Sequence, residues 1–458
     1  MEKPVFLYKI VLEKPEYTKT MFYRKIQEEL YRYYADKDAP IVIVDGARQI
    51  GKSFIIRETA SASFNNYIEI NLKDDYDGRQ LFSKIQTIDD FYFTVSSLYG
   101  ERLGNIDGTI IFLDEIQVYP KLISMLKPLK QDRRYRYIAS GSLLGITLKH
   151  IFIPMGSIND IKMYPMDFEE FLLANGTGKD VIDYLRRCFE NKEPVSESVH
   201  SAMLRRFKEY LISGGLPDAI KAMVEEKNIA RVRSVQTMTL NYYKDDASQY
   251  DEENNLHIRR IYDMLPSYME NRTKRVILKN IENKDDTDLK KYQDEFDYLI
   301  YSGCALPNKA IANPKFPLDE SQTKSLIKLY YNDVGILSDI LYRNNVSAIL
   351  DYDSNINLGS VYETVSAMEL SAHGHELFYF DRKKVGEVDF IINDYDNLSV
   401  LPIEIKSGKN QNNYRALPKL VDAEREYNIK QGIVFGNKNI IETKGNITTY
   451  PIYMIMFV

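Results

Sequence analysis

One stretch of the sequence decides the fold: Asp45-Gly46-Ala47-Arg48-Gln49-Ile50-Gly51-Lys52-Ser53. It fits G-x-x-x-x-G-K-[ST], the phosphate-binding P-loop. The apolar run at 41–44 before it predicts a buried strand, and residues 54–60 after it predict the start of a helix. A strand, a glycine-rich loop and a helix together aim backbone N–H groups and a helix N-terminus at phosphate oxygens. The motif therefore predicts a nucleotide site, against the alternative of a chance glycine turn.

Each residue of this loop has an expected task. Lys52 is predicted to reach the β- and γ-phosphates, and the Ser53 hydroxyl to bind Mg²⁺. The rest of the loop is predicted to wrap the phosphates: Gly46, Ala47, Arg48, Gln49, Ile50 and Gly51. ATP and Mg²⁺ are the expected cofactors.

A second apolar run, at 109–113, ends in Asp114-Glu115. The carboxyl end of a neighbouring strand is where the Mg²⁺-binding acid of a P-loop ATPase lies. We expect Asp114 to hold the metal, directly or through water. Glu115 is expected to orient the attacking water, which favours hydrolysis over nucleotide storage.

A third predicted strand, at 136–139, leads into Ser140-Gly141-Ser142. Ser140 is a candidate sensor of the γ-phosphate, and Ser142 is a second one. Ser-Gly-Ser is equally good turn chemistry, so both interpretations stay open.

Bulk properties narrow the class of protein. The 458 residues suit about two to four domains. No apolar run is long enough to span a bilayer, and the first residues do not resemble a secretory signal. Two cysteines exclude a disulfide framework and a cysteine-rich zinc site, and a reducing cytoplasm is the expected location. The net charge of −6 argues against a globally basic nucleic-acid binder but leaves a local basic face open.

The order of predicted elements gives an α/β protein in four segments. Residues 1–175 are expected to form a P-loop parallel sheet with helices on both faces, and 176–250 a helical lid or linker. Residues 251–340 suit a winged helix-turn-helix, and 341–458 a small α/β domain.

The winged-helix segment has two open interpretations. It is either a DNA-binding module or a protein lid. If it binds DNA, the basic side chains Lys274, Arg275 and Lys279 are expected to contact phosphates.

A second constellation lies near the carboxyl end. A strand at 387–392 carries Asp389, and the next strand carries Glu404-Ile405-Lys406. Residues two apart in a strand share one face, so Glu404 and Lys406 are expected to meet Asp389. Asp389 and Glu404 would bind Mg²⁺, and Lys406 would position or deprotonate a water for attack on a phosphodiester. Glu363, on a preceding helix, would complete the metal shell.

This is the pattern of restriction-endonuclease-like domains of the PD-(D/E)xK type. The alternative is a Glu404–Lys406 salt bridge on a solvated face.

These features together resemble the prokaryotic AAA-type ATPases that join an amino-terminal P-loop core to a carboxyl-terminal domain of unknown function. The motifs that carry the resemblance are Gly46-Ala47-Arg48-Gln49-Ile50-Gly51-Lys52-Ser53, Phe112-Leu113-Asp114-Glu115-Ile116-Gln117, Ser140-Gly141-Ser142, Tyr164-Pro165-Met166-Asp167-Phe168-Glu169-Glu170-Phe171, Tyr210-Leu211-Ile212-Ser213-Gly214-Gly215-Leu216-Pro217, Lys328-Leu329-Tyr330-Tyr331-Asn332-Asp333-Val334-Gly335-Ile336-Leu337, Glu387-Val388-Asp389-Phe390 and Ile403-Glu404-Ile405-Lys406-Ser407-Gly408. The resemblance implies ATP binding with slow hydrolysis, a winged-helix middle and a nuclease-like end.

One segment departs from the family pattern. Many relatives carry an arginine before the Tyr-Pro motif, whereas residues 154–160 contain none. Arg133, Arg134 or an arginine of a neighbouring subunit are the alternatives for contacting phosphate.

The expected function is an ATP-hydrolysing switch coupled to a nuclease-like domain. One alternative is an ATP-gated, Mg²⁺-dependent DNA nuclease, and another is a non-catalytic scaffold that grips a protein or nucleic-acid partner. The oligomeric state stays open.

Overall fold

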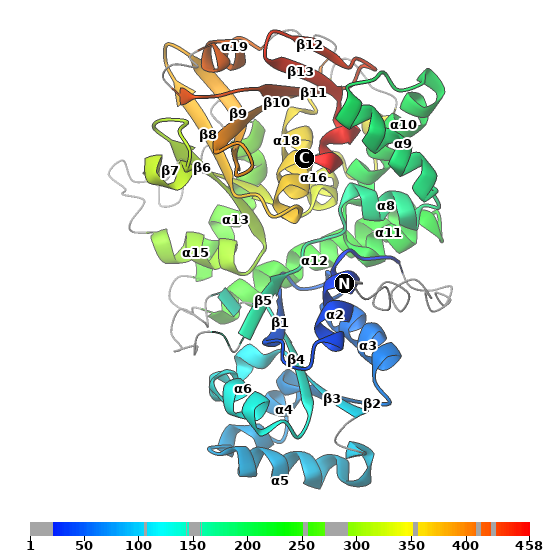
Figure 1. Ribbon diagram of the computed structural model, residues 1–458, viewed down its shortest axis with the longest axis vertical. Coiled ribbons are helices and arrows are strands. Elements are labelled where there is room, and N and C mark those ends of the chain that lie inside the picture. Colours follow the sequence, from blue (N-terminus) through cyan, green and yellow to red (C-terminus); the bar gives the residue numbers. More distant parts are fainter. Residues whose placement is uncertain are drawn as a thin grey trace, which may run out of the picture. The chain divides into compact units, whose positions relative to one another are not determined.

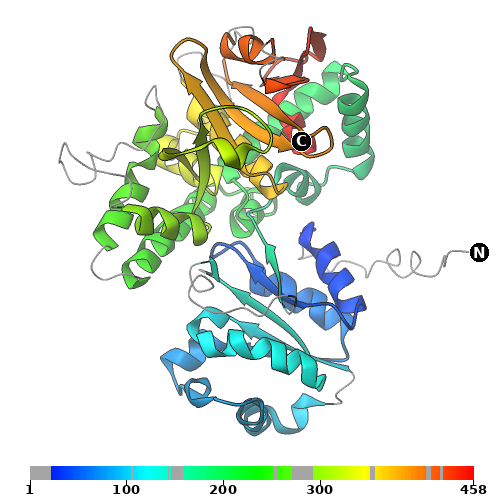
Figure 2. The same cartoon turned by 60° about the vertical axis from the view of Figure 1, so that its left-hand side comes forward.

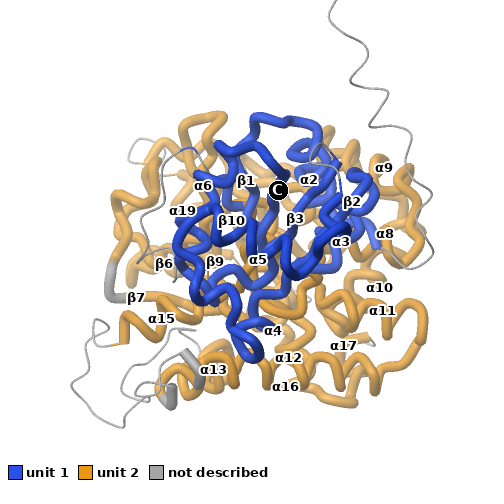
Figure 3. The backbone as a smooth tube through the Cα atoms, turned by 90° about the horizontal axis from the view of Figure 1, so that it is seen from below, with its two compact units in different colours: residues 1–43, 52–140, 153–160 blue, residues 44–51, 141–152, 161–458 orange. Residues whose placement is uncertain are grey.

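The computed structural model describes most of the chain: residues 22–104, 108–142, 144–145, 156, 158–250, 255–270, 292–350, 356–408, 414–422 and 427–458. Its internal contacts divide the chain into two compact units (Figure 3). The first comprises residues 1–43, 52–140 and 153–160, and the second comprises 44–51, 141–152 and 161–458.

A five-stranded sheet with helices on both sides forms the amino-terminal part (Figure 1). The strands are β1 (Ile41–Asp45), β2 (Asn66–Asn71), β3 (Thr109–Asp114), β4 (Arg136–Gly141) and β5 (Ile158–Lys162), in the order β2-β3-β4-β1-β5. The helices are α2 (Ile26–Ala35), α3 (Lys52–Ser63), α4 (Leu72–Asp77), α5 (Ile88–Tyr99) and α6 (Pro120–Asp132). The predicted α/β class with a parallel P-loop sheet is confirmed.

The central strands follow from their composition. β1 and β3 are buried along their whole length, as expected for apolar strands covered on both faces. β2 lies at the edge and is only partly buried. β3 runs parallel to β2 and to β4, so the residues that follow β3 and β4 gather at one edge of the sheet.

Helices dominate the first half of the second unit. They are α8 (Phe168–Ala174), α9 (Lys179–Asn191), α10 (Glu197–Ser213), α11 (Pro217–Val224), α12 (Ile229–Tyr250), α13 (Asn255–Glu270), α15 (Gln293–Tyr301), α16 (Val334–Tyr342), α17 (Ser347–Leu350), α18 (Gly359–Ala372) and α19 (Ala416–Val421).

A buried aspartate joins two of these helices. Gly214 is the C-cap of α10, and the backbone N–H of Gly215 donates a 2.6 Å hydrogen bond to Asp333, the N-cap of α16. Asp333 also accepts from the N–H of Ile336 at 3.0 Å. A Cβ on Gly214 would lie 2.1 Å from the Asp333 carboxylate, so the pair of glycines permits this close approach.

An eight-stranded mixed sheet fills the second half of this unit (Figure 2). Its strands are β6 (Ala305–Ile311), β7 (Gln322–Tyr331), β8 (Leu377–Arg382), β9 (Gly386–Asp394), β10 (Ser399–Lys406), β11 (Gly432–Gly436), β12 (Glu442–Lys444) and β13 (Ile447–Pro451), in the order β12-β13-β11-β10-β9-β8-β6-β7. β8, β9 and β10 form an antiparallel meander, and β11 runs parallel to β10.

The hairpin β6–β7 belongs to this sheet, because β6 pairs with β8 in parallel. It lies within 251–340, the segment predicted as a separate winged helix. The expected boundary at 340/341 therefore runs through one sheet. The basic residues Lys274, Arg275 and Lys279 fall outside the described residues.

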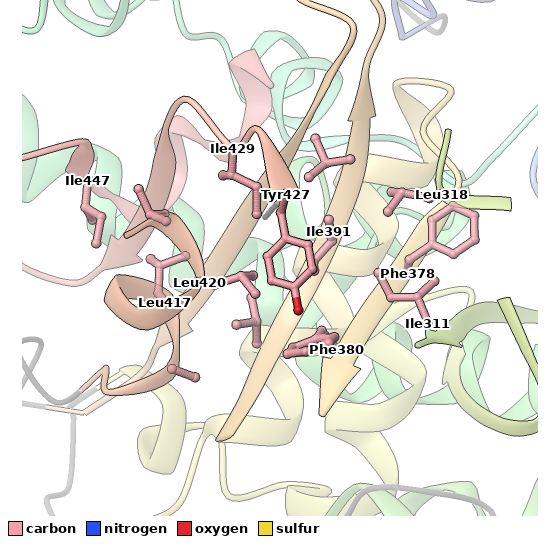
Figure 4. Close-up of a cluster of buried hydrophobic side chains, with 14 of the residues drawn as sticks. Ile311, Leu318, Phe378, Phe380, Ile391, Leu417, Leu420, Tyr427, Ile429 and Ile447 are labelled. Carbon is pink, nitrogen blue, oxygen red and sulfur yellow. The ribbon is translucent and has the colours of Figure 1, made fainter. Parts of the chain in front are cut away.

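An apolar core anchors the meander (Figure 4). Phe378 and Phe380 of β8 pack with Ile391 of β9, and Leu417 and Leu420 of α19 belong to the same cluster. α18 packs against β6, β8 and β10. The centre of the sheet is thus held by helices close to it in sequence.

Two further observations concern the cysteines and the helices. Cys188 and Cys304 are both buried and free of disulfides. Within the described ranges, no helix combines the length and apolarity needed to cross a membrane.

Candidate functional site

The P-loop backbone adopts conformations that only a few residue types tolerate. Gly46 has φ +152° and Gly51 φ +93°, while Gln49 has φ +64°. A Cβ on Gly46 would lie 2.3 Å from the carbonyl oxygen of Met163, so no other residue fits there. The loop leads directly into α3, which begins at Lys52, so the N–H groups of its first turn have no partners within the helix.

Three side chains of the first unit converge at the ends of α3, β3 and β4. Ser53 Oγ donates to Asp114 Oδ2 at 2.8 Å. Ser140 Oγ donates to the other oxygen of Asp114. Burial raises the pKa of the Asp114 carboxyl, while the hydrogen bonds from Ser140 and Ser53 act to lower it. Lys52 is buried and adds a favourable charge to the same carboxylate.

This donor set fits Mg²⁺ bound to a nucleotide. A hydroxyl beside a carboxylate, with a lysine nearby, is the set that holds Mg²⁺ and phosphate in P-loop enzymes. Ser140, one of the two candidate sensors of the γ-phosphate, donates its hydroxyl to Asp114.

Glu115 leaves the strand at a sharp turn. Its φ of +56° places it in the left-handed region, which costs a non-glycine residue about 1–2 kcal/mol. Its side chain accepts a hydrogen bond from Gln117 Nε2. Gln117 thereby fixes the orientation of Glu115, a task that the sequence pattern alone did not assign.

The two predicted substitutes for a phosphate-contacting arginine lie at the wrong end of the sheet. Arg133 and Arg134 precede β4, whereas Ser140 lies at the carboxyl end of that strand. Arg133 pairs with Asp38 at 3.2 Å, and Arg134 pairs with Asp132 at 3.0 Å. The expectation that either contacts nucleotide within its own chain is wrong, because a strand length separates them from the site.

Residues of α12 hold the P-loop from outside. Arg48 Nε forms a 2.5 Å ion pair with Asp246. The Tyr243 hydroxyl donates to the carbonyl of Arg48 at 3.0 Å and accepts from Asn332 Nδ2 at 3.1 Å. No sequence pattern marked Tyr243 or Asp246, since their role depends on a contact far along the chain.

The carboxyl-terminal constellation also comes together. Lys406 Nζ lies 2.5 Å from Glu404 Oε1, and Asp389 Oδ2 accepts from the N–H of Ile405 at 2.9 Å. Both Glu404 and Lys406 are largely buried, so the interpretation as a solvated surface salt bridge does not fit.

The electrostatics of this group are dominated by its carboxylates. Burial raises the pKa of Glu404, Asp389 raises it further, and Lys406 lowers it. Burial acts to lower the pKa of Lys406, but Glu404 and Asp389 raise it by more. Lys406 therefore stays protonated, and the Glu404 carboxyl holds its proton more tightly than a free glutamate does.

An irregular segment of β9 aims Asp389. Phe378 of β8 pairs with Ile391, yet Phe380 pairs with Val388, so β9 has one more residue than β8 between these pairs. Such bulges redirect side chains and are frequent beside active sites. Regular pairing of β9 with β8 does not hold through the segment that carries Asp389.

Glu363 lies on α18 and contacts a tyrosine of β7. Its Oε2 accepts a 3.2 Å hydrogen bond from the Tyr330 hydroxyl, and Glu363 affects the pKa of Glu404 less than Asp389 and Lys406 do. In the described part of the chain, no group of three or more His, Cys, Asp or Glu side chains is arranged to hold a metal ion. Glu363 thus does not form a three-carboxylate shell with Asp389 and Glu404.

A two-carboxylate site remains compatible with Mg²⁺. Glu404 Oε2 is buried and has no hydrogen-bond partner among the described residues. Mg²⁺ commonly uses one or two protein carboxylates and takes its other ligands from water and substrate phosphates. Asp389 and Glu404 are the residues that could hold it here.

Comparison with protein families divides the chain into three parts. Residues 38–172 match an AAA domain. Together with the parallel sheet and its P-loop, this identifies the amino-terminal part. It is an AAA-type P-loop ATPase core. Residues 204–347 match a domain of unknown function (DUF8612), and residues 358–455 match another (DUF4143).

Solved structures give more distant likenesses. A Walker-type ATPase of Pyrococcus abyssi has 13% sequence identity and a TM-score of 0.42, with 71% of this chain and 98% of that chain covered. A variant of RuvB from Thermotoga maritima has 13% identity and a TM-score of 0.30, with 62% and 89% covered. No curated protein matches the chain.

Proposed function

We propose that this chain binds ATP and hydrolyses it in the presence of Mg²⁺. The observation that carries the proposal is the hydrogen-bonded set Ser53–Asp114–Ser140 beside Lys52. Lys52 would bind the β- and γ-phosphates, and Ser53 and Asp114 would hold Mg²⁺. When bound, Mg²⁺ neutralises charge that develops on the phosphates. Glu115, oriented by Gln117, would position the attacking water and accept its proton.

Steady-state ATP turnover by the full chain tests this role. Glu115→Gln should retain ATP binding and lose turnover by about 10²-fold or more, the usual scale for a positioned base. Lys52→Ala should abolish tight ATP binding, because it removes the main counter-charge to the phosphates. The exposed residues Glu29 and Lys121 supply the controls Glu29→Gln and Lys121→Ala, which should behave as wild type. Wild-type turnover in Glu115→Gln would refute the role of Glu115.

We further propose that the ATPase core acts as a switch for a nuclease-like centre at Asp389, Glu404 and Lys406. Two observations favour it: the contacts among these residues, and the order α18, β8, β9, β10, α19, β11. This order contains a helix followed by adjacent strands that carry Asp389, Glu404 and Lys406, the elements on which the sequence pattern rests, and it supports the proposal. Mg²⁺ at the two carboxylates would supply Lewis-acid activation, and the Lys406 ammonium would orient a water toward a phosphodiester.

Calorimetric titration of Mn²⁺ tests this second centre. It is run on full-length Lys52→Ala, so that the ATP site stays free of nucleotide, with and without Asp389→Ala. Heat that disappears with Asp389→Ala supports a metal site. Equal heats would refute it and leave Glu404–Lys406 as a structural ion pair, which favours the scaffold alternative.

A further inference from the structure

Three buried polar side chains of the hairpin β6–β7 point toward the carboxylates. Asn308 lies on β6, opposite Lys328 of β7, and Tyr330 follows two residues later. All three are almost fully inaccessible to solvent, with Lys328 only 1% exposed. Burying a polar side chain costs free energy of folding unless it finds a hydrogen-bond or ion-pair partner. The partners of these three side chains therefore indicate what the hairpin holds in place.

Lys328 reaches the strand that carries Asp389. Its ammonium lies 4.6 Å from the ring centroid of Tyr379 on β8 and forms an ion pair with Glu387 on β9. Burial acts to lower the pKa of Lys328, but Glu363, Glu387 and Asp389 raise it by more. The lysine therefore lies as a fixed cation among three carboxylates.

Asn308 holds the irregular part of β9 itself. Its Nδ2 donates a 3.0 Å hydrogen bond to the backbone carbonyl of Asp389. Asp389 lies between Val388 and Ile391, where the pairing of β9 with β8 is interrupted. A bulge frees backbone groups that need other partners, and the Asn308 amide satisfies one of them.

Tyr330 completes the set from the same strand as Lys328. Its hydroxyl donates to Glu363 on α18 at 3.2 Å. The hairpin thus contacts Glu363, Glu387 and the backbone of Asp389 with one side chain each.

We propose that Lys328, with Asn308 and Tyr330, is a positioning residue of the carboxylate centre, which holds β9 so that Asp389 presents its carboxylate to a divalent cation. The inference rests on the proposed metal centre at Asp389 and Glu404. It assigns the hairpin, which the sequence placed in a separate module, to that centre.

Mn²⁺ titration of full-length protein in the Lys52→Ala background tests the inference. Lys328→Met should weaken Mn²⁺ binding about tenfold or more, the scale on which partners behind metal ligands act. Lys309→Met is the matched control: Lys309 lies on the same hairpin and pairs with Glu376 at 3.4 Å, outside the centre. It should change the affinity less than about twofold, since exposed pairs contribute little.

A second, milder variant keeps the test valid if Lys328→Met does not fold. Tyr330→Phe removes one hydroxyl and should weaken Mn²⁺ binding severalfold while the thermal unfolding temperature changes little. If Lys328 acts through Glu387, adding Glu387→Met to Lys328→Met should cost little further affinity.

The outcomes separate this inference from the proposed function. Unchanged or tighter Mn²⁺ binding in folded Lys328→Met, or in Tyr330→Phe where Lys328→Met does not fold, would overturn the positioning role alone. Tighter Mn²⁺ binding would mean that the positive charge of Lys328 only repels the metal ion. Wild-type heats that are insensitive to Asp389→Ala would overturn the metal centre, and this inference with it.

Discussion

The residues from Gly46 to Ser53 are consecutive in the chain, whereas Asn308, Lys328, Glu363, Asp389 and Glu404 come from five separate elements. The P-loop obtains its shape from local backbone conformations, with positive φ at Gly46, Gln49 and Gly51. The carboxylate centre obtains its shape from strand pairing and buried side-chain contacts. A contiguous site can be recognised from its spacing alone, but a dispersed one depends on the whole sheet around it.

The comparison implies that ATP turnover does not depend on the side chains of the carboxylate centre. Asp114→Asn, which changes the ATP site, should give the largest effect. ATP turnover should fall about 10²–10³-fold, as when one charge-stabilising group is removed from a reacting centre. Asp389→Asn should leave turnover within about twofold of wild type. The control Asp38→Asn changes an exposed acid that pairs with Arg133. A large loss of turnover in Asp389→Asn would contradict the separation.

The contact between Gly214 and Asp333 should not tolerate one added methyl group, and Gly214→Ala measures the loss of stability. The added methyl meets the Asp333 carboxylate at a φ of +64°. We expect the free energy of unfolding to fall by about 2–4 kcal/mol from strain and overpacking. Gly374→Ala is the control, because its φ of +88° is similar but nothing lies within 4 Å. It should cost only about 1–2 kcal/mol, measured by urea denaturation. Equal losses would show that the close approach at Gly214 is unimportant.

The same aspartate should give the second unit a pH dependence. Burial raises the pKa of Asp333 to about 6, although N–H groups of Gly215 and Ile336 act to lower it. The folded state therefore holds this proton more tightly than the unfolded state. The stabilisation that comes from protonated Asp333 is complete below about pH 4 and is lost as the pH rises through about 6.

The unfolding free energy of wild type, relative to Asp333→Asn, should fall by about 2–3 kcal/mol from pH 4 to pH 7. Denaturant titrations at several pH values measure this difference. A difference that is constant with pH would show that the carboxylate stays ionised when folded.

The smallest expected effect concerns the residue behind Glu115. Gln117→Leu should slow ATP turnover roughly fivefold, the equivalent of the ~1 kcal/mol that a hydrogen bond commonly contributes. ATP affinity should not change, because Gln117 donates its hydrogen bond to Glu115, which would act on the water and not on the nucleotide. Gln131→Leu, at an exposed position of α6, is the control. A change in ATP affinity without a change in turnover would show that Gln117 contributes to nucleotide binding and not to positioning the attacking water.

The fold of the amino-terminal part could be predicted because its signals are local. The apolar run at 41–44 became β1, and Asp114 ended β3 as expected. The helix expected after the P-loop is α3. Arg133 and Arg134 were considered as phosphate contacts because they are cationic. The direction of β4 places them at the amino end of the strand, away from Ser140.

The carboxyl-terminal part could be predicted only in outline. Glu404 and Lys406 meet because two residues of one strand share a face, a rule that needs no partner strand. Asp389 lies where β9 departs from regular pairing, and such departures have no reliable pattern in one sequence. The contacts of Lys328 and Asn308 required knowledge that β6 pairs with β8.

The pairing of β6 with β8 also decides where this protein can be cut. A fragment that starts at residue 358, where the DUF4143 match begins, would lack both strands of the hairpin. β8 would then become a bare edge that carries unpaired N–H and C=O groups, which invites aggregation with other copies. Such a fragment would also lose Asn308, Lys328 and Tyr330. A soluble, competent half-molecule should therefore begin upstream of Ala305, well before the boundary that sequence families suggest.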